Sequence, residues 1–396
     1  MRGRAFIATL VAAVSVGIQG PAAAAATEPD FSRIPLWVYG HSYTTDPGEV
    51  NTPGKEWMPD LARSLRSPSW RTFGVGSSRI IDTYGDIARQ ASRSPVAGSA
   101  WTGSRRGAVV LQSEFNDAIN PAFYGATSSR TLSRLAAGNY GQTLQASLAL
   151  LSSRERRDWS TSTARGAWRS SSGPAYLGGS LTYTTTPGAY REMKVNVGAS
   201  GTAWLVTWEV SSRIANPRTG TTSIAVDGRV RSVIPPRAAS WEVIWSRRGA
   251  AQAHAVGPRA TALTGLTPGW HTVRVTKGDR GPGAVYLDQL AVQSDTPVPV
   301  VVVKDPPALT KGKSWVTRYA GTVAANRRLL HQQIDSVVHQ SPFAHVTTAT
   351  LDGIRPEHYG YDGVHLSDAG MRFEATRLET VLRSHLRTHR SAAMYR

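Results

Sequence analysis

The sequence contains no cysteine, and only 6 of its 45 basic residues are lysine. Without cysteine the chain can form neither a disulfide nor a thiolate site, so its stability must come from a packed core. Its 27 acidic residues leave a formal net charge of +18. We expect such a protein to adhere to anionic surfaces such as cell-wall polymers or lipid headgroups. The arginines are scattered and form no basic stripe with aromatics, which disfavours specific nucleic-acid binding.

The sequence also lacks an apolar run of the ~20 residues that a membrane-spanning helix needs. The strongest candidate lies at the amino end, where Arg2 and Arg4 precede the apolar segment 5–18 and residues 21–26 are mostly small. This order is typical of a secretory signal peptide. We therefore expect residues 1–26 to be a signal peptide cut near Ala26, the mature protein to be secreted, and no transmembrane segment to follow.

The alternation of apolar runs divides the rest of the chain into three parts. Between residues 31 and 154, short apolar runs such as 36–39 and 108–112 alternate with helical patterns, which is typical of βα units on a parallel sheet. From about residue 156 to 295, seven short alternating runs are separated by Gly, Ser and Thr, which predicts an antiparallel β-sandwich.

The α/β pattern resumes after the predicted sandwich. The apolar run 298–303 has the composition of a buried parallel strand, and helical patterns follow it at 316–338 and from Ser367. Such a strand needs parallel neighbours, which only the amino-terminal part provides. We predict one α/β domain, residues 27–154 and 297–396, interrupted by a β-sandwich at residues 155–296. We also expect the two cores to be separate, so that excising about 158–296 leaves a folded α/β domain.

The first apolar run of the predicted mature chain ends in a serine. The stretch LWVYGHSYTTD places Ser42 directly after Gly40 and His41, and a strand ending in this way can present a hydroxyl at an active site. The Gly-x-Ser-x-Gly elbow of α/β-hydrolases is disfavoured because position 44 is threonine and because the serine lies on the first strand.

Three further segments carry side chains or N–H groups suited to acyl transfer. In YDGVHLSDAG, Asp362 can orient the imidazole of His365, which can then accept a serine proton. In VVLQSEFNDA, Asn116 ends an apolar run, where its amide can stabilise an oxyanion. The turn GVGSS offers a backbone N–H at Gly76 or Ser77. Each segment alone is equally compatible with an ordinary turn.

Together and in this order, the four segments resemble the conserved blocks of the SGNH hydrolases, also called GDSL esterases and lipases. The resemblance covers about residues 31–154 and 297–386. It implies a flavodoxin-like three-layer α/β/α domain and a serine esterase that uses no metal or other cofactor. The residues that match the blocks are Ser42, Gly76 or Ser77, Asn116, Asp362 and His365.

The resemblance also implies a role for each residue. Ser42 would be the nucleophile, His365 the general base and then acid, and Asp362 its orienting partner. The backbone N–H groups of Ser42 and Gly76 and the side chain of Asn116 would form the oxyanion hole.

The chain departs from the family pattern at three places. His41 stands where an aspartate is usual, and we expect activity to survive because that aspartate is regarded as structural support. Glu114 replaces a glycine and is expected to narrow or charge the pocket. The second glycine of GVGSS comes one position early, which leaves Gly76 and Ser77 both open. His358 is placed at the pocket rim. The other histidines are predicted to be solvated or to have ordinary hydrogen-bond partners, without a role in catalysis or metal binding: His254, His271, His331, His339 and His345.

The predicted sandwich resembles the jelly-roll carbohydrate-binding modules of bacterial glycan-active enzymes, in phrases such as TSIAVDG and VYLDQLAV. Exposed aromatics can stack on sugar rings, but most aromatics of a sandwich belong to its core. The candidates for sugar stacking are Trp168, Tyr176, Tyr183, Trp241 and Trp245.

The sequence thus predicts a secreted serine esterase that removes acyl groups, with acetyl expected, from a polysaccharide or cell-wall glycan. A lipase or phospholipase is the first alternative, because the basic charge suits lipid headgroups. An acyltransferase would use the same triad. A glycan-binding protein on a non-catalytic esterase scaffold is the alternative outside enzymes.

Overall fold

The structure is a computed structural model that describes most of the chain. The described residues are 30–44, 57–76, 78–93, 107–123, 132, 134–172, 179–210, 220–235, 255–278, 283–306, 314–360 and 363–388. The predicted signal peptide, Ser77 and Asp362 lie outside these ranges. Within them, no helix combines the length and apolar character needed to cross a membrane.

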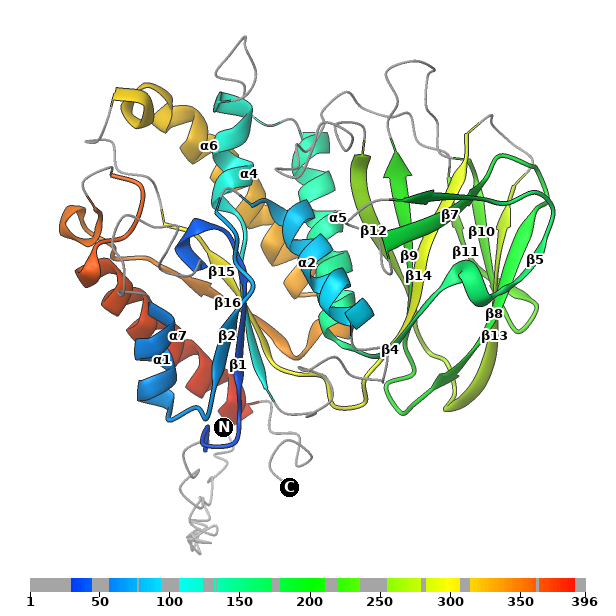
Figure 1. Cartoon of the computed structure of the whole chain (residues 1–396), viewed down its shortest axis with the longest axis horizontal. Coiled ribbons are helices and arrows are strands. Elements are labelled where there is room, and N and C mark those ends of the chain that lie inside the picture. Colours follow the sequence, from blue (N-terminus) through cyan, green and yellow to red (C-terminus); the bar gives the residue numbers. More distant parts are fainter. Residues whose placement is uncertain are drawn as a thin grey trace, which may run out of the picture.

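Five parallel strands form a sheet at the centre of the α/β domain (Figure 1). In spatial order they are β2 (Trp70–Thr72), β1 (Leu36–Gly40), β3 (Ala108–Gln112), β15 (Val300–Lys304) and β16 (Val346–Thr350). Numbered along the chain within this sheet, the order is 2-1-3-4-5, that of flavodoxin-like doubly wound folds. Every residue of β1 and β3 is buried, as expected for strands covered on both faces.

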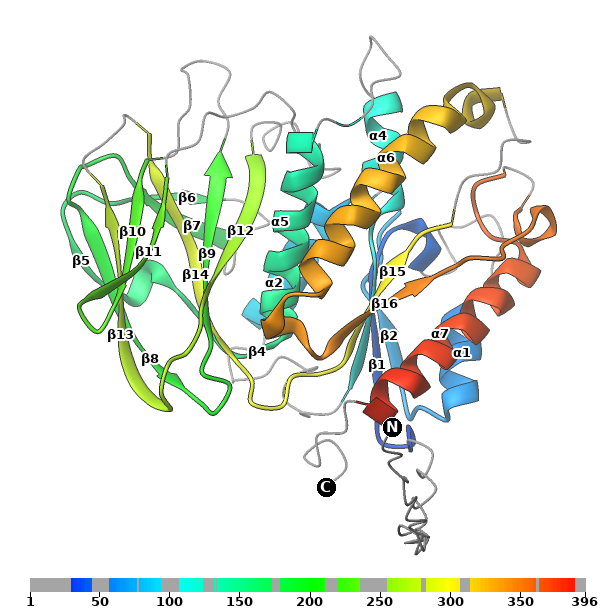
Figure 2. The ribbon, with the colours of Figure 1, turned by 180° about the vertical axis from the view of Figure 1, so that it is seen from behind.

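Helices cover both faces of this sheet (Figures 1 and 2). One face packs against α1 (Trp57–Leu65) and α7 (Asp368–Thr388), and the other lies under α2 (Ile80–Arg93), α4 (Phe115–Phe123), α5 (Arg134–Leu151) and α6 (Ser314–Val338). Side chains of a strand alternate between faces. Leu36 and Val38 accordingly join the core with α1 and α7, whereas Trp37 and Tyr39 join the core with α2 and α5.

The insertion between α5 and β15 consists of two antiparallel sheets. The outer sheet has the order β11 (Arg229–Ile234), β10 (Thr222–Val226), β13 (Gly269–Lys277), β8 (Tyr190–Val197) and β5 (Thr163–Arg165). The inner sheet has the order β12 (Ala255–Leu263), β9 (Ala203–Val210), β14 (Val285–Gln293), β7 (Ser180–Thr184) and β6 (Arg169–Ser172), and β4 (Ser153–Asp158) also pairs with β14. The predicted fold, an α/β domain interrupted by an antiparallel β-sandwich, is confirmed.

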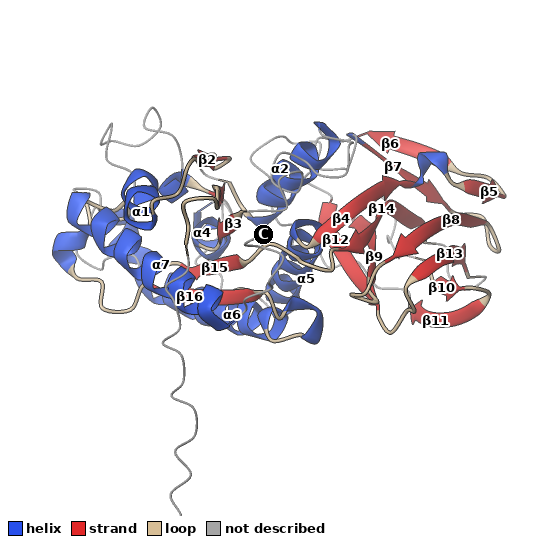
Figure 3. Cartoon of the chain, turned by 90° about the horizontal axis from the view of Figure 1, so that it is seen from below, coloured by secondary structure: helices blue, strands red, loops and turns tan. Residues whose placement is uncertain are grey.

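The central strands β9 and β14 of the inner sheet are buried on both faces, so the molecule is built in layers (Figure 3). Leu205 of β9 faces the outer sheet, whereas Trp204, Val206 and Trp208 face the helices of the α/β domain. The ring of Trp204 stacks on Phe343 with 5.0 Å between ring centroids.

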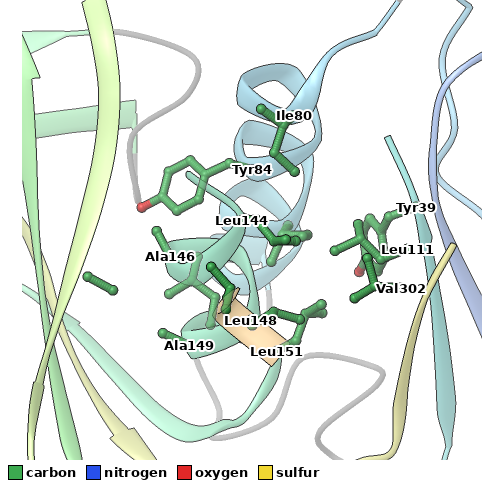
Figure 4. Packing of buried hydrophobic residues seen from close by; sticks show 14 of the residues in the cluster. Tyr39, Ile80, Tyr84, Leu111, Leu144, Ala146, Leu148, Ala149, Leu151 and Val302 are labelled. Carbon is green, nitrogen blue, oxygen red and sulfur yellow. The ribbon is translucent and has the colours of Figure 1, made fainter. Parts of the chain in front are cut away.

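The helix α5 lies between the parallel sheet and the inner sheet, and its residues contribute to one continuous core (Figure 4). That core joins Tyr39 and Val302 of the parallel sheet, Leu144 of α5, and Trp204 of the sandwich. The expectation of two separate cores is therefore wrong. The physical reason is that α5 buries side chains around most of its circumference, and each buried side needs a partner.

Candidate active site

Ser42 lies at the carboxyl end of β1, where the strand turns into the short helix η1 (Ser42–Thr44). A side chain at Gly40 would collide with the Gln112 carbonyl of β3, so the sharp exit from the strand requires glycine. The turn is closed by a hydrogen bond from the Thr44 N–H to the His41 carbonyl at 2.9 Å. The indole N–H of Trp57 donates to the Tyr43 carbonyl at 2.9 Å. Ser42 is half-buried on this fixed turn.

His365 reaches the same edge of the sheet from the loop that precedes α7. Its Nε2 lies 3.1 Å from Ser42 Oγ, although the two residues are 323 positions apart in sequence. The loop is held by a hydrogen bond from the Gly360 N–H to the His365 carbonyl at 2.7 Å. The Tyr43 hydroxyl donates to the Val364 carbonyl at 2.5 Å, which ties the histidine loop to the serine turn. A serine and an imidazole in this contact have the geometry of a nucleophile and its base.

Asp362, the predicted acid, lies outside the described residues, as does Ser77. Gly363, which follows Asp362, has a φ of +66°. That left-handed conformation favours glycine and places a turn just before His365.

The loop after β2 carries Gly76 past the serine turn. Its Val75 N–H donates to the Gly40 carbonyl at 3.2 Å, and a side chain at Gly74 would collide with Thr44. The GVGSS segment therefore runs directly along the turn that carries Ser42. Gly76 is half-buried in this loop.

Asn116 lies in the first turn of α4 and is buried. Its side-chain Nδ2 donates to the Ser78 carbonyl at 2.8 Å, which fixes the orientation of the amide. The amide group has two N–H donors, and this bond uses one of them. The structure thus ties Asn116 to Ser78, the last residue of the GVGSS segment.

Asp305, a residue to which the sequence predicted no role, lies beneath the serine turn at the end of β15. Its Oδ2 accepts hydrogen bonds from His41 Nε2 at 2.8 Å and from the Phe115 N–H at 2.7 Å. Its Oδ1 accepts from the Gln112 side chain at 2.9 Å. One carboxylate therefore joins the carboxyl ends of three neighbouring strands. The only signal in the sequence was its position two residues after the apolar run 298–303.

The surroundings of Asp305 favour its ionised form. Burial alone would raise the pKa of this carboxyl. The His41 ring beside it and the hydrogen bonds from Gln112 and Phe115 have a larger effect and lower the pKa. His41 Nδ1 accepts from the Tyr43 N–H at 3.4 Å, which assigns the donating hydrogen to Nε2. His41 is therefore an internal support of the serine turn, in agreement with the structural role expected for this position.

Glu114 belongs to the same buried network and does not line the pocket, which corrects the expectation for this residue. Its Oε2 accepts from the Asp305 N–H at 3.0 Å and lies 2.8 Å from His331 Nε2. Burial raises the pKa of Glu114, and the bond to His331 and the charge of Arg327 oppose that rise.

Glu374 of α7 is a third fully buried carboxyl, beside Asp305 and Glu114. Its Oε1 accepts from Gln112 Nε2 at 2.8 Å. Burial, followed by the nearby charge of Asp305, raises its pKa well above the usual range. The two carboxyls that share Gln112 are thus held in opposite protonation states, with Asp305 ionised and Glu374 neutral.

The other histidines singled out in the sequence have local hydrogen-bond partners where the structure describes them. His345 Nε2 lies 2.7 Å from Ser152 Oγ, and His339 Nδ1 donates to the Asp335 carbonyl at 2.7 Å. His358 accepts from the Arg355 N–H at 2.9 Å and stacks on Phe373. His254 lies outside the described residues. No group of three or more His, Asp or Glu side chains suited to a metal ion occurs in the described part of the chain.

The aromatics proposed for sugar stacking have other contacts or lie outside the described ranges. Trp168 packs against the sandwich core with the Arg191 guanidinium over its ring, and Tyr183 stacks on Tyr286 at 5.3 Å. Tyr176, Trp241 and Trp245 are not among the described residues.

Trp270, which sequence reasoning missed, is 64% exposed on the outer sheet. The alternation in WHTVRVT could have indicated this, because Trp270 shares a face with Thr272 and Arg274.

No protein family and no curated protein matches this chain. Solved structures resemble part of it at low TM-scores. The family 35 carbohydrate-binding module from Clostridium thermocellum is 19% identical, with 35% of this chain and 98% of that chain covered and a TM-score of 0.26. The CBM36-1 domain of a multidomain xylanase from the hindgut metagenome of Trinervitermes trinervoides is 10% identical, with coverages of 34% and 92% and a TM-score of 0.23.

A third similar structure is the exo-β-1,3-galactanase from Phanerochaete chrysosporium, at 14% identity and a TM-score of 0.26. The match covers 34% of this chain but only 28% of the galactanase. At these TM-scores, none of the three likenesses carries a conclusion about the ligand or the activity of this chain.

Proposed function

We propose that this protein is a secreted SGNH-type serine esterase. The observation that carries the proposal is the 3.1 Å contact between Ser42 Oγ and His365 Nε2. It lies at the carboxyl edge of a doubly wound parallel sheet, where such folds place their active sites. The adjoining segments of Gly76 and Asn116 lie on the same edge and supply N–H groups of the kind that an oxyanion needs.

In the proposed reaction His365 removes the proton from Ser42 as the oxygen attacks the ester carbonyl. The carbonyl oxygen becomes an oxyanion, which the N–H groups of Ser42 and Gly76 and the Asn116 amide stabilise. His365 then returns the proton to the leaving alkoxide, and an acyl-serine remains. Water, deprotonated by His365, then attacks this ester. The bond to Ser42 Oγ breaks, His365 returns the proton to Ser42, and the carboxylic acid is released. Asp362 takes the role of orienting the imidazole.

We propose an acylated polysaccharide or cell-wall glycan as the substrate, with acetyl as the acyl group. The support for a glycan is the exposed Trp270 ring on the outer sheet, with polar Asn196 opposite it on β8. The net charge of +18 would hold the protein to anionic wall polymers. Hydrolysis of lipid esters and acyl transfer between sugars use the same groups, and the assay below separates glycan esters from lipid esters.

The test combines an active-site probe with a substrate series. A fluorophosphonate should label wild type, and peptide mapping should locate the label at Ser42. Hydrolysis of p-nitrophenyl acetate through decanoate, beside acetylated xylan and peptidoglycan, ranks the acyl groups and alcohols. A preference for decanoate with no glycan activity would favour a lipase.

The matched variant for this test is Ser42→Ala. We expect it to lose at least ~10³-fold in kcat with an unchanged circular dichroism spectrum, because the members of such a triad act as a unit. Retention of more than a few per cent of activity would contradict the assignment of Ser42 as nucleophile.

A further inference from the structure

The sandwich contacts the α/β domain through a buried polar cluster as well as through apolar packing. The hydroxyl of Tyr84, on α2, donates to Asp288 Oδ2 of β14 at 2.7 Å. The same oxygen accepts from the indole N–H of Trp208 at 2.8 Å. The side chain of Gln289 donates back to the Tyr84 hydroxyl at 2.8 Å. Asp288 is only 1% exposed, so its carboxylate depends on these donors.

This cluster fixes one side of α2 to the inner sheet. Figure 4 shows Tyr84 extending from α2 away from Tyr39, Leu111 and Val302 and toward the strands of the sandwich. Its ring also meets Trp208 edge to face, with 5.9 Å between centroids. Burial and the neighbouring Asp288 raise the pKa of Tyr84 well above its usual range, so the hydroxyl stays protonated and remains a donor.

The amino end of α2 is fixed to the proposed oxyanion hole. The Ile80 N–H donates to Asp117 Oδ2 at 2.9 Å, and the Ser78 carbonyl accepts from Asn116 Nδ2 at 2.8 Å. The Ser78 N–H donates to the Val75 carbonyl at 3.0 Å. Tyr84 follows Ile80 by four residues, which is about one helical turn. A shift of α2 would therefore move the segment that carries Gly76 and orients Asn116.

We propose that Asp288 of the sandwich and Tyr84 of α2 are positioning residues for the proposed ester hydrolysis, because they hold α2 and thereby its adjoining oxyanion-stabilising groups. The inference rests on the proposed function for its catalytic consequence. It assigns the sandwich a second role, since a strand of the insertion becomes part of the framework of the active site. A displacement of oxyanion donors lowers kcat more than it raises KM, because these groups act mainly as the oxyanion forms.

The test variant is Tyr84→Phe, which keeps the ring and removes the hydroxyl. The matched control is Tyr286→Phe. Tyr286 is half-buried on the same strand as Asp288, and the substitution likewise removes only a tyrosine hydroxyl. We expect Tyr84→Phe to lower kcat on p-nitrophenyl acetate about tenfold with KM within twofold, as removal of a buried hydrogen bond would. Tyr286→Phe should stay within twofold of wild type. Equal kcat values for the two variants would overturn the proposal. So would a loss of kcat/KM that comes from a raised KM instead of a lowered kcat.

Amide hydrogen exchange measures the positioning independently of activity. Residues 78–83 should exchange at least several-fold faster in Tyr84→Phe than in Tyr286→Phe. Unchanged exchange overturns the anchoring itself. If wild type is inactive and Ser42 is not labelled, the esterase proposal is wrong and the catalytic part of this inference is wrong with it. The hydrogen-exchange result still decides whether Tyr84 and Asp288 anchor α2. Should Tyr84→Phe not fold, Asp288→Asn serves the same test, since it keeps the volume and weakens both accepted bonds.

Discussion

Asn116 has two tasks at the residue scale, because its amide both holds the Ser78 carbonyl and is proposed to face the oxyanion. We expect Asn116→Ala to lower kcat by ~10²-fold with little change in KM, since a preorganised donor matters mainly in the transition state. Steady-state kinetics on p-nitrophenyl acetate check this. The control is Asp117→Ala, which removes the bond to the Ile80 N–H but leaves the amide in place and should cost at most about tenfold. Equal losses in the two variants would mean that Asn116 acts only through α2.

Glu374 allows a test of pH dependence. Its raised pKa means that the folded protein binds a proton that the unfolded chain releases above pH 4.5, so wild type loses stability as pH rises from that value toward the folded pKa. Glu374→Gln keeps an acceptor for Gln112 and cannot ionise. We expect the variant to be more stable than wild type at pH 7, with the difference shrinking toward pH 4.5. Urea unfolding at a series of pH values measures this, and a pH-independent difference would contradict the neutral form of Glu374.

At the scale of elements, the turn between β10 and β11 is fixed to β13 by His271. Its Nδ1 lies 2.6 Å from Asp227 Oδ2 and its Nε2 lies 2.7 Å from the Thr267 carbonyl. Since both ring nitrogens face acceptors, the doubly protonated ring satisfies both contacts. The Thr267 carbonyl and Asp227 raise the pKa of His271, and the Thr272 N–H and His271 lower that of Asp227.

The sign of the resulting pH effect follows from both shifts. The contribution of His271 is complete below its unfolded pKa of about 6.5 and is lost as pH rises through the raised folded value. The contribution of Asp227 is lost only as pH falls through its lowered folded pKa. We expect His271→Gln to destabilise the protein more at pH 6 than at pH 9. The control is His339→Gln, because the His339 ring also donates to a carbonyl but is exposed. The destabilisation caused by this control should differ little between the two pH values. Thermal unfolding compares them.

The elements that the sequence predicted well are those with a local signal. Ser42 and His365 could be predicted as partners because Ser42 follows a strand pattern and His365 precedes a helical pattern. The structure brings them within 3.1 Å, and their catalytic roles stay a prediction. Asp305 was missed because its partner His41 is 264 positions away, and an aspartate after a strand is also an ordinary turn residue. A signal for the double-sided burial of β9 was present in AWLVTWEV, where one alternating set is Trp, Val, Trp and Val and the other still begins with Ala203 and Leu205. It was missed because a sandwich strand is expected to bury only one face.

At the scale of the whole molecule, the continuous core contradicts the expected independence of the sandwich. Excising residues 158–296 would remove Trp204, Val206 and Trp208 from the core and leave the adjoining faces of α2 and α5 without cover. Each exposed large apolar side chain costs about 1.5 to 3 kcal/mol, against a total stability of about 5 to 15 kcal/mol. We expect the excised protein, bridged by a short Gly/Ser linker, to be insoluble or unfolded. A soluble, cooperatively folded product, seen by size exclusion and thermal unfolding, would contradict this.

The placement of the sandwich between α5 and β15 also sets the order in which the molecule can be completed during synthesis. The strand β3 pairs with β1 on one side and with β15 on the other, and β15 leaves the ribosome only after the entire sandwich. Until then β3 is an open strand edge of the kind that promotes misassociation. Ser42 is likewise made 323 residues before His365. Under the proposed mechanism a nascent chain therefore has no catalytic power until His365 has been made, and a truncated translation product carries Ser42 without its proposed base.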